Sequence, residues 1–124
     1  MRVKATLALC LLAAALCSCA RASSTPVVSV AGGDAGRGKA VIQKYGCSAC
    51  HMIPGVPGPE TSVGPSLAGV ANRVFIAGVT PNVPDAMIKW LKDPPSVDTL
   101  TAMPMLGLSD AEARDAAAYL YSLR

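Results

Sequence analysis

The densest group of reactive side chains in this sequence lies in the stretch YGCSACH, residues 45–51. It holds Cys47, Cys50 and His51, which are the two cysteines beyond residue 19 and the single histidine of the chain. Two cysteines three positions apart bring their thiols to one side of a helical turn, and the next residue projects beside them. C-x-x-C-H is the attachment signature of c-type haem, in which both thiols bond to the macrocycle and the histidine binds the iron. We therefore predict one covalently attached haem c.

Other sites that use paired cysteines fit the sequence less well. A structural zinc site needs four ligands, usually in two separated pairs, and no cysteine or histidine follows His51. A thioredoxin-like dithiol needs a βαβ setting, whereas only the segments VVSV and RVFIAGV resemble strands. A plain disulfide leaves the adjacent histidine unexplained. A non-haem CxxC thiol oxidoreductase remains one alternative function.

A haem held by one histidine needs a sixth ligand or has an open coordination site. The chain offers Met1, Met52, Met87, Met103 and Met105. Met1 belongs to the leader, Met52 adjoins the histidine on the wrong haem face, and Met87 lies at a core position of a helix. Met103 lies in the loop TAMPML, where Pro104 restricts it, so we predict that its thioether binds the iron. Without that ligand the alternative is an open haem, as in an enzyme or gas sensor.

Local signals predict three clear helices around this site. The first is capped by Asp34 and runs to about Lys44. The second starts at Pro84 or Asp85 and stops after Lys92, before Pro94. The third begins at the capping box of Ser109 and Glu112. The proline- and glycine-rich residues 53–69 form a loop. The predicted fold is all-α, with three to four short helices and long loops wrapped around the haem.

The N-terminus reads as an export signal. Arg2 and Lys4 precede an apolar stretch, residues 5–16, that is too short to span a bilayer comfortably. We predict a lipoprotein-type signal peptide over residues 1–18, lipidation of Cys19, a flexible tether over residues 19–33 and one domain over residues 34–124. Ordinary cleavage after Ala22 is the alternative. The expected location is the periplasm or the extracytoplasmic face of the membrane.

Charge gives no argument for nucleic-acid binding. The chain has a net charge of +3, and removal of the leader leaves nine basic against eight acidic residues, or +1. A nearly neutral domain lacks the strong basic patch that a nucleic-acid surface needs. We instead expect docking of redox partners through apolar loop residues such as Met52, Ile53 and Val56.

The ordered motifs CSACH, GPSLAGVANR, IAGVTPNVPDAMIKWLKDP and MPMLGLSDAE resemble bacterial class I cytochromes c. More narrowly, the chain is similar, from about residue 33 onwards, to the cytochrome c domain of caa3-type oxidase subunit II. It departs from that subunit because the sequence lacks the copper-binding Cys/His cluster and the membrane helices.

The resemblance implies roles for further residues. The Pro65 carbonyl would accept a hydrogen bond from His51, while Arg73, Asn82 and Trp90 would lie near the haem propionates or haem edge. Gly38 and Tyr119 would mark the crossing of the first and last helices. The implied function is that of a monomeric one-electron carrier, not an enzyme. Its implied redox partners are a haem-copper oxidase or a dehydrogenase of a respiratory chain.

Overall fold

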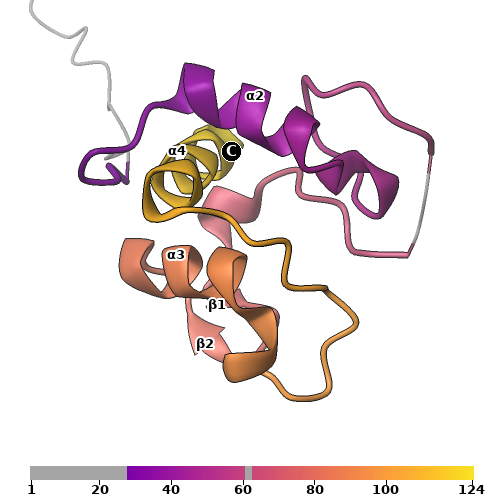
Figure 1. The fold of residues 1–124 in the computed structure, drawn as a ribbon, viewed down its shortest axis with the longest axis vertical. Helices are drawn as coiled ribbons and strands as arrows, with labels where there is room; N and C mark the ends of the chain where they lie inside the picture. Colours follow the sequence, from indigo (N-terminus) through magenta and orange to yellow (C-terminus); the bar gives the residue numbers. More distant parts are fainter. Residues whose placement is uncertain (1–27, 61–62) are drawn as a thin grey trace, which may run out of the picture.

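The computed structural model describes residues 28–60 and 63–124. The predicted signal peptide, Cys19 and most of the predicted tether lie outside the described residues. Three α-helices, α2 (Ala35–Lys44), α3 (Pro84–Lys92) and α4 (Asp110–Ser122), carry the fold (Figure 1). α4 contacts both of the others, so it forms the centre of the helical framework. The predicted all-α architecture with long loops is confirmed.

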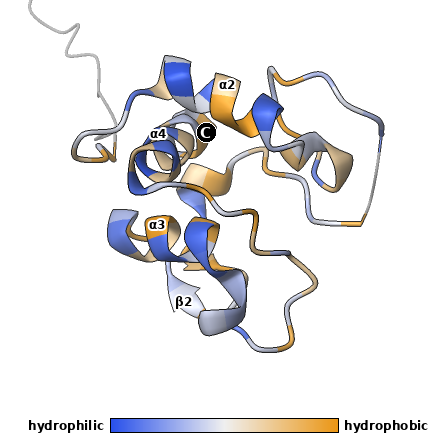
Figure 2. Ribbon diagram, viewed as in Figure 1, coloured by the Kyte–Doolittle hydropathy of each residue, from blue (hydrophilic) through white to orange (hydrophobic). Residues whose placement is uncertain are grey.

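α2 begins and ends where the sequence predicts. The side chain of Asp34 accepts a hydrogen bond from the Arg37 amide at 2.7 Å, which satisfies one of the free N–H groups of the first turn. The helix buries Gly38, Val41 and Ile42 against the core. Figure 2 shows hydrophilic and hydrophobic residues alternating along this helix, as its partial burial requires.

α4 presents a face of small side chains to α2. Its N-terminus carries the predicted capping box between Ser109 and Glu112. Ala113, Ala116 and Ala117 are almost completely buried, as the apolar stripe predicts. At the crossing, a Cβ on Gly38 would lie 1.9 Å from the Asp115 carbonyl oxygen and 2.9 Å from Tyr119 Cβ. Only a glycine allows the two helices to approach so closely, and this explains a residue that weakens helix propensity.

α3 covers the other side of α4. Pro84 occupies its first turn, where a missing N–H costs nothing, and Asp93 ends it. The helix buries Met87, Ile88 and Leu91. A short 3₁₀ helix, η3 (Pro94–Ser96), follows directly and turns the chain towards the loop that precedes α4.

The connections contain more regular structure than the sequence predicts. Two further 3₁₀ helices occur, η1 (Cys47–Ala49) and η2 (Val70–Asn72). The strands β1 (Phe75–Ile76) and β2 (Thr80–Pro81) form an antiparallel hairpin, with Phe75 opposite Pro81 and Ile76 opposite Thr80. β1 falls in the strand-like segment RVFIAGV and β2 follows directly after it, so the hairpin adds a small sheet to an otherwise helical fold.

The folded unit begins before residue 34, so the predicted end of the tether needs correction. Val30 is buried, and the carbonyl of Ala31 accepts a hydrogen bond from Arg114 at 3.3 Å. A Cβ on Gly33 would lie 2.5 Å from the Arg114 carbonyl oxygen, so this segment lies directly on α4. Burial of Val30 stabilises the docked chain, because apolar surface leaves water.

Candidate functional site

A cavity of about 720 Å³ lies between the helical framework and the loops, and we call it the main cavity. This volume is within the range of about 300–1,000 Å³ that is usual for small-molecule and cofactor sites. Its lining is mostly apolar. The predicted site residues that line it are Cys47, Cys50, His51, Pro65, Arg73, Trp90 and Met103.

The two cysteines enter the cavity from a tight turn after α2. Gly46 has a φ of 67°, which ends the helix and starts η1. The amides of Cys50 and His51 then donate to the Cys47 carbonyl at 3.2 and 3.1 Å. Both cysteines are free thiols, and burial raises the pKa of the Cys47 thiol. Redox-active dithiols need a lowered thiol pKa, so this environment argues against the thiol oxidoreductase alternative.

The ring of His51 is oriented by a backbone carbonyl. Its Nδ1 lies 2.7 Å from the Pro65 oxygen, which is the acceptor implied by the family resemblance. A carbonyl can only accept, so the ring donates through Nδ1. Neutral imidazole with one nitrogen held by a hydrogen bond is the usual form of a metal-binding histidine. The Gly64 amide donates to the Cys50 carbonyl at 2.7 Å and ties the two segments together.

The methionines occupy different positions around the cavity. Met103 lines the main cavity and is partly buried, and its amide donates to Thr101 Oγ1 at 3.1 Å. Met105 is 63% exposed and does not line the cavity. Met87 also lines the main cavity, from α3, and is buried in the core as expected. Met103 is therefore the loop methionine whose position agrees with a role at the iron.

Two of the residues expected at the haem edge reach the main cavity and one does not. Arg73 lines it, and its guanidinium donates to the backbone carbonyls of Ser66 and Ala68. Trp90 lines it from α3. Asn82 does not line the cavity itself. Its side-chain amide is instead used in hydrogen bonds to backbone carbonyls and to Tyr121.

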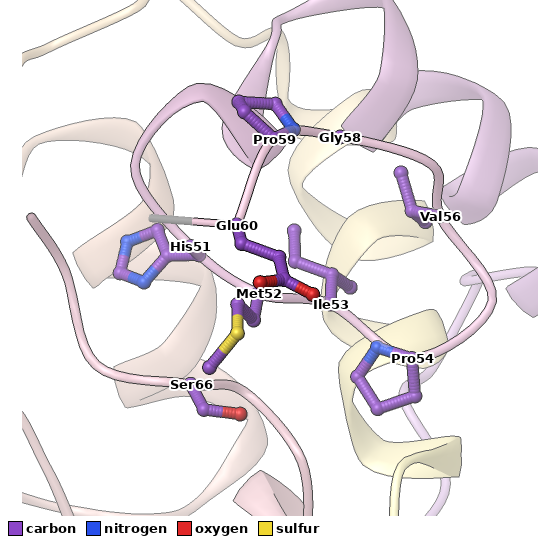
Figure 3. Close-up of a pocket in the computed structure, with 9 residues that line it drawn as sticks. All are labelled: His51, Met52, Ile53, Pro54, Val56, Gly58, Pro59, Glu60 and Ser66. Atoms are coloured by element: carbon purple, nitrogen blue, oxygen red, sulfur yellow. The ribbon is translucent and has the colours of Figure 1, made fainter. Parts of the chain in front are cut away.

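A second cavity, of about 320 Å³, shares His51 and Ile53 with the first. In Figure 3 the carboxylate of Glu60 points towards Met52 and Ile53. Met52 is 47% exposed, whereas Ile53 and Val56 are buried in the core. The expectation that all three apolar residues offer a docking surface is therefore wrong for Ile53 and Val56.

Within residues 28–60 and 63–124, no group of three or more His, Cys, Asp or Glu side chains could hold a metal ion. In the same part of the chain, no helix has the length and apolar character needed to cross a membrane.

Comparison with known families decides the identity. Residues 35–124 match the family model for cytochrome c. The chain belongs to the cytochrome c family. This cytochrome is also 31% identical, over 91 residues, to cytochrome c oxidase subunit 2 of Alkalihalophilus pseudofirmus (strain ATCC BAA-2126 / JCM 17055 / OF4). The match covers 73% of the cytochrome and 26% of that relative, so the chain corresponds to about a quarter of the longer protein.

The predicted resemblance to a class I cytochrome c and to an oxidase subunit II is confirmed. Membership of the family makes the chain a c-type cytochrome that acts in electron transfer and implies covalently bound haem c. The residues present fit that group, because Cys47, Cys50 and His51 line the same largely apolar cavity and the two cysteines form no disulfide.

Sequence reasoning missed one residue of this site. A Cβ on Gly64 would lie 2.5 Å from His51 Cε1 and 2.7 Å from His51 Nδ1, so Gly64 leaves the space that the ring fills. The dipeptide Gly64-Pro65 within GPSLAGVANR was the available signal. It marks a turn, but local sequence cannot show which side chain lies against that turn.

Proposed function

We propose that this cytochrome carries a single haem with His51 and Met103 as iron ligands, and that it transfers one electron at a time in a respiratory chain. The observation that carries the proposal is the main cavity, which is lined by both thiols, His51 and the thioether-bearing loop residue. With His51 and Met103 both bound to it, the iron would be closed to substrates. An electron carrier needs no open position, whereas an enzyme or gas sensor does.

Each group of the chain has a distinct part in this proposal. When bound, the haem supplies the ferric/ferrous couple that accepts and releases one electron. Cys47 and Cys50 would hold the macrocycle covalently. The Pro65 carbonyl orients His51, and a methionine ligand at Met103 favours the ferrous state. The apolar lining would exclude water, and Arg73, which lines the cavity, would bring a positive charge towards the propionates.

The respiratory role is supported by the similarity to an oxidase subunit. We propose that the donor or acceptor is a membrane oxidase or dehydrogenase. We further propose that the protein is held at the extracytoplasmic face of the membrane by a lipid on Cys19, with cleavage after Ala22 as the alternative. Contacts between electron carriers are usually small and transient, which suits a monomer with nearly neutral charge.

Extraction in acidic acetone tests haem attachment. The pigment of the wild-type protein should stay with the polypeptide, with one haem per chain by pyridine haemochrome analysis. The single variants Cys47→Ala and Cys50→Ala should each lose one thioether and shift the haemochrome band. Free extraction of haem from the wild type would show that the thioether assignment is wrong.

Fractionation of a bacterium with lipoprotein processing tests the anchor. The wild type should sediment with membranes, and Cys19→Ala should become soluble. Cys17→Ala is the matched control, because bulky Leu16 before it makes it a poor lipidation site. A wild-type protein found entirely in the soluble fraction would favour cleavage after Ala22.

A further inference from the structure

The side chain of Asn82 connects three separate parts of the fold. Its Nδ2 donates to the carbonyls of Val70 and Arg73, at 2.8 and 2.9 Å. Its Oδ1 accepts from the Tyr121 hydroxyl at 2.9 Å. Both amide hydrogens are therefore used, and the side chain has one position only. We call Asn82 and Tyr121 together the Asn82 bracket.

The bracket is anchored in the helical core. Tyr121 is 1% exposed, lies on α4 and is among the largest fully buried side chains. A buried hydroxyl that loses its partner destabilises the fold, so the bond to Asn82 is strongly favoured. The Ala71 amide also donates to the Leu123 carbonyl at 3.1 Å. Together these contacts hold η2 against the end of α4.

From η2 the contacts continue to the histidine. Arg73, whose carbonyl the bracket holds, donates through its guanidinium to the carbonyls of Ser66 and Ala68. The Val70 amide donates to the Leu67 carbonyl at 3.2 Å. The restrained segment starts next to Pro65, whose carbonyl lies 2.7 Å from His51 Nδ1. The position of that acceptor thus depends on contacts that reach back to α4.

We infer that Asn82 and Tyr121 are positioning residues for the His51 ligand, acting through η2, Arg73 and the Pro65 carbonyl. The inference rests on the proposed function, because it takes His51 as the iron ligand. A well-aligned hydrogen bond on Nδ1 makes the imidazole a more basic ligand, and this stabilises ferric iron. Loosening the bracket should weaken that bond without touching haem, iron or ligands.

Two variants and one control test the inference in the haem-loaded protein. Asn82→Ala removes all three side-chain bonds, and Tyr121→Phe removes only the hydroxyl. The control is Asn72→Ala. Asn72 is an exposed asparagine in η2, the 3₁₀ helix that the bracket holds, and its side chain does not line the main cavity. The first readout is NMR hydrogen exchange of the His51 Nδ1 proton in the reduced protein, relative to the Ile42 amide in the core of α2. The second is the reduction potential.

Both bracket variants should speed exchange of the His51 proton relative to Ile42, by about tenfold for Asn82→Ala, as expected for the loss of a net hydrogen bond. The potential should rise, because a less basic ligand stabilises ferric iron less. Asn72→Ala should change neither quantity. A purely structural role would speed both protons equally. If such a general loosening let solvent reach the haem, the reduction potential would fall instead of rising.

Unchanged relative exchange, or a potential that stays constant or falls, would overturn the inference. If Asn82→Ala does not fold, the milder Tyr121→Phe decides by the same criteria. The wild-type spectrum separates this failure from that of the proposed function. A wild type without covalent, histidine-bound haem overturns both, whereas a normal wild type with unresponsive variants overturns the positioning role alone.

Discussion

The imidazole ring of His51 fills the space where Gly64 lacks a side chain. A Cβ at position 64 would lie 2.5 Å from Cε1, 2.7 Å from Nδ1 and 3.0 Å from Nε2 of that ring. The ring cannot yield freely, because its Nδ1 is held by the Pro65 carbonyl. Gly64 and Pro65 thus fix the position of the proposed iron ligand from two sides.

Gly64→Ala should therefore disturb both stability and ligation. We expect the free energy of unfolding to fall by about 1–3 kcal/mol, as for overpacking of a filled site. Urea denaturation measures the loss, and the NMR shift of the His51 Nδ1 proton reports the displaced ring. An unchanged shift together with unchanged stability would show that the ring has room to move.

At the crossing of α2 and α4, a substitution should reduce the free energy of unfolding by more than Gly64→Ala does. In Gly38→Ala the new methyl group would meet the Asp115 carbonyl oxygen at 1.9 Å, and neither backbone can rotate away. We expect a loss of about 3 kcal/mol in the free energy of unfolding, measured by urea denaturation. Gly36→Ala in the same helix is the control. Its Cβ meets only the Asp34 carboxylate, at 3.2 Å, so the gain in helix propensity should leave stability equal or higher.

The lowered pKa of Glu112 should account for part of the loss of stability of the fold in acid. Its pKa is lowered from 4.5 to about 2 by the hydrogen bond from Lys44, and further by Ser109 and Tyr45. A carboxylate with a lowered folded-state pKa stabilises the protein above its unfolded value, and this contribution is lost as the pH falls. The relevant window therefore runs from pH 4.5 down to about 2.

Glu112→Gln should reduce the slope of the free energy of unfolding in that window. The measurement is urea denaturation at a series of pH values, with Glu60→Gln as a control for the loss of an exposed carboxylate. A variant with the same acid slope as the wild type would show that Lys44 and Tyr45 do not stabilise the charged form of Glu112.

The two loop methionines should respond differently to truncation. Met103→Ala should remove the weak far-red band of ferric iron bound to a thioether, lower the reduction potential and let carbon monoxide bind ferrous iron. Met105 is exposed and outside the main cavity, so Met105→Ala should keep the band and lose little stability. If Met105→Ala removes the band and Met103→Ala keeps it, Met105 is the ligand and Met103 is not. A wild type without the band that binds carbon monoxide readily would favour the open-haem alternative.

The sequence alone determined the features that depend on neighbours along the chain. The spacing of Cys47, Cys50 and His51 indicated the cofactor, because attachment chemistry requires that local pattern. The caps of α2 and α4 were predictable for the same reason, since Asp34 and Ser109 bond to amides three residues away. The family resemblance added the Pro65 carbonyl as the acceptor for His51, and Gly38 as the place where the first and last helices cross.

Only the tertiary structure decided features built by contacts between distant segments. Asn82 and Tyr121 are 39 positions apart, and nothing in the local sequence shows that this asparagine joins η2 to α4. The same holds for Gly64 against His51 and for Val30, whose burial moves the start of the folded unit into the predicted tether. Local propensity sets caps and turns, but the partner of a buried polar group is chosen by packing, which brings together residues that the sequence keeps apart.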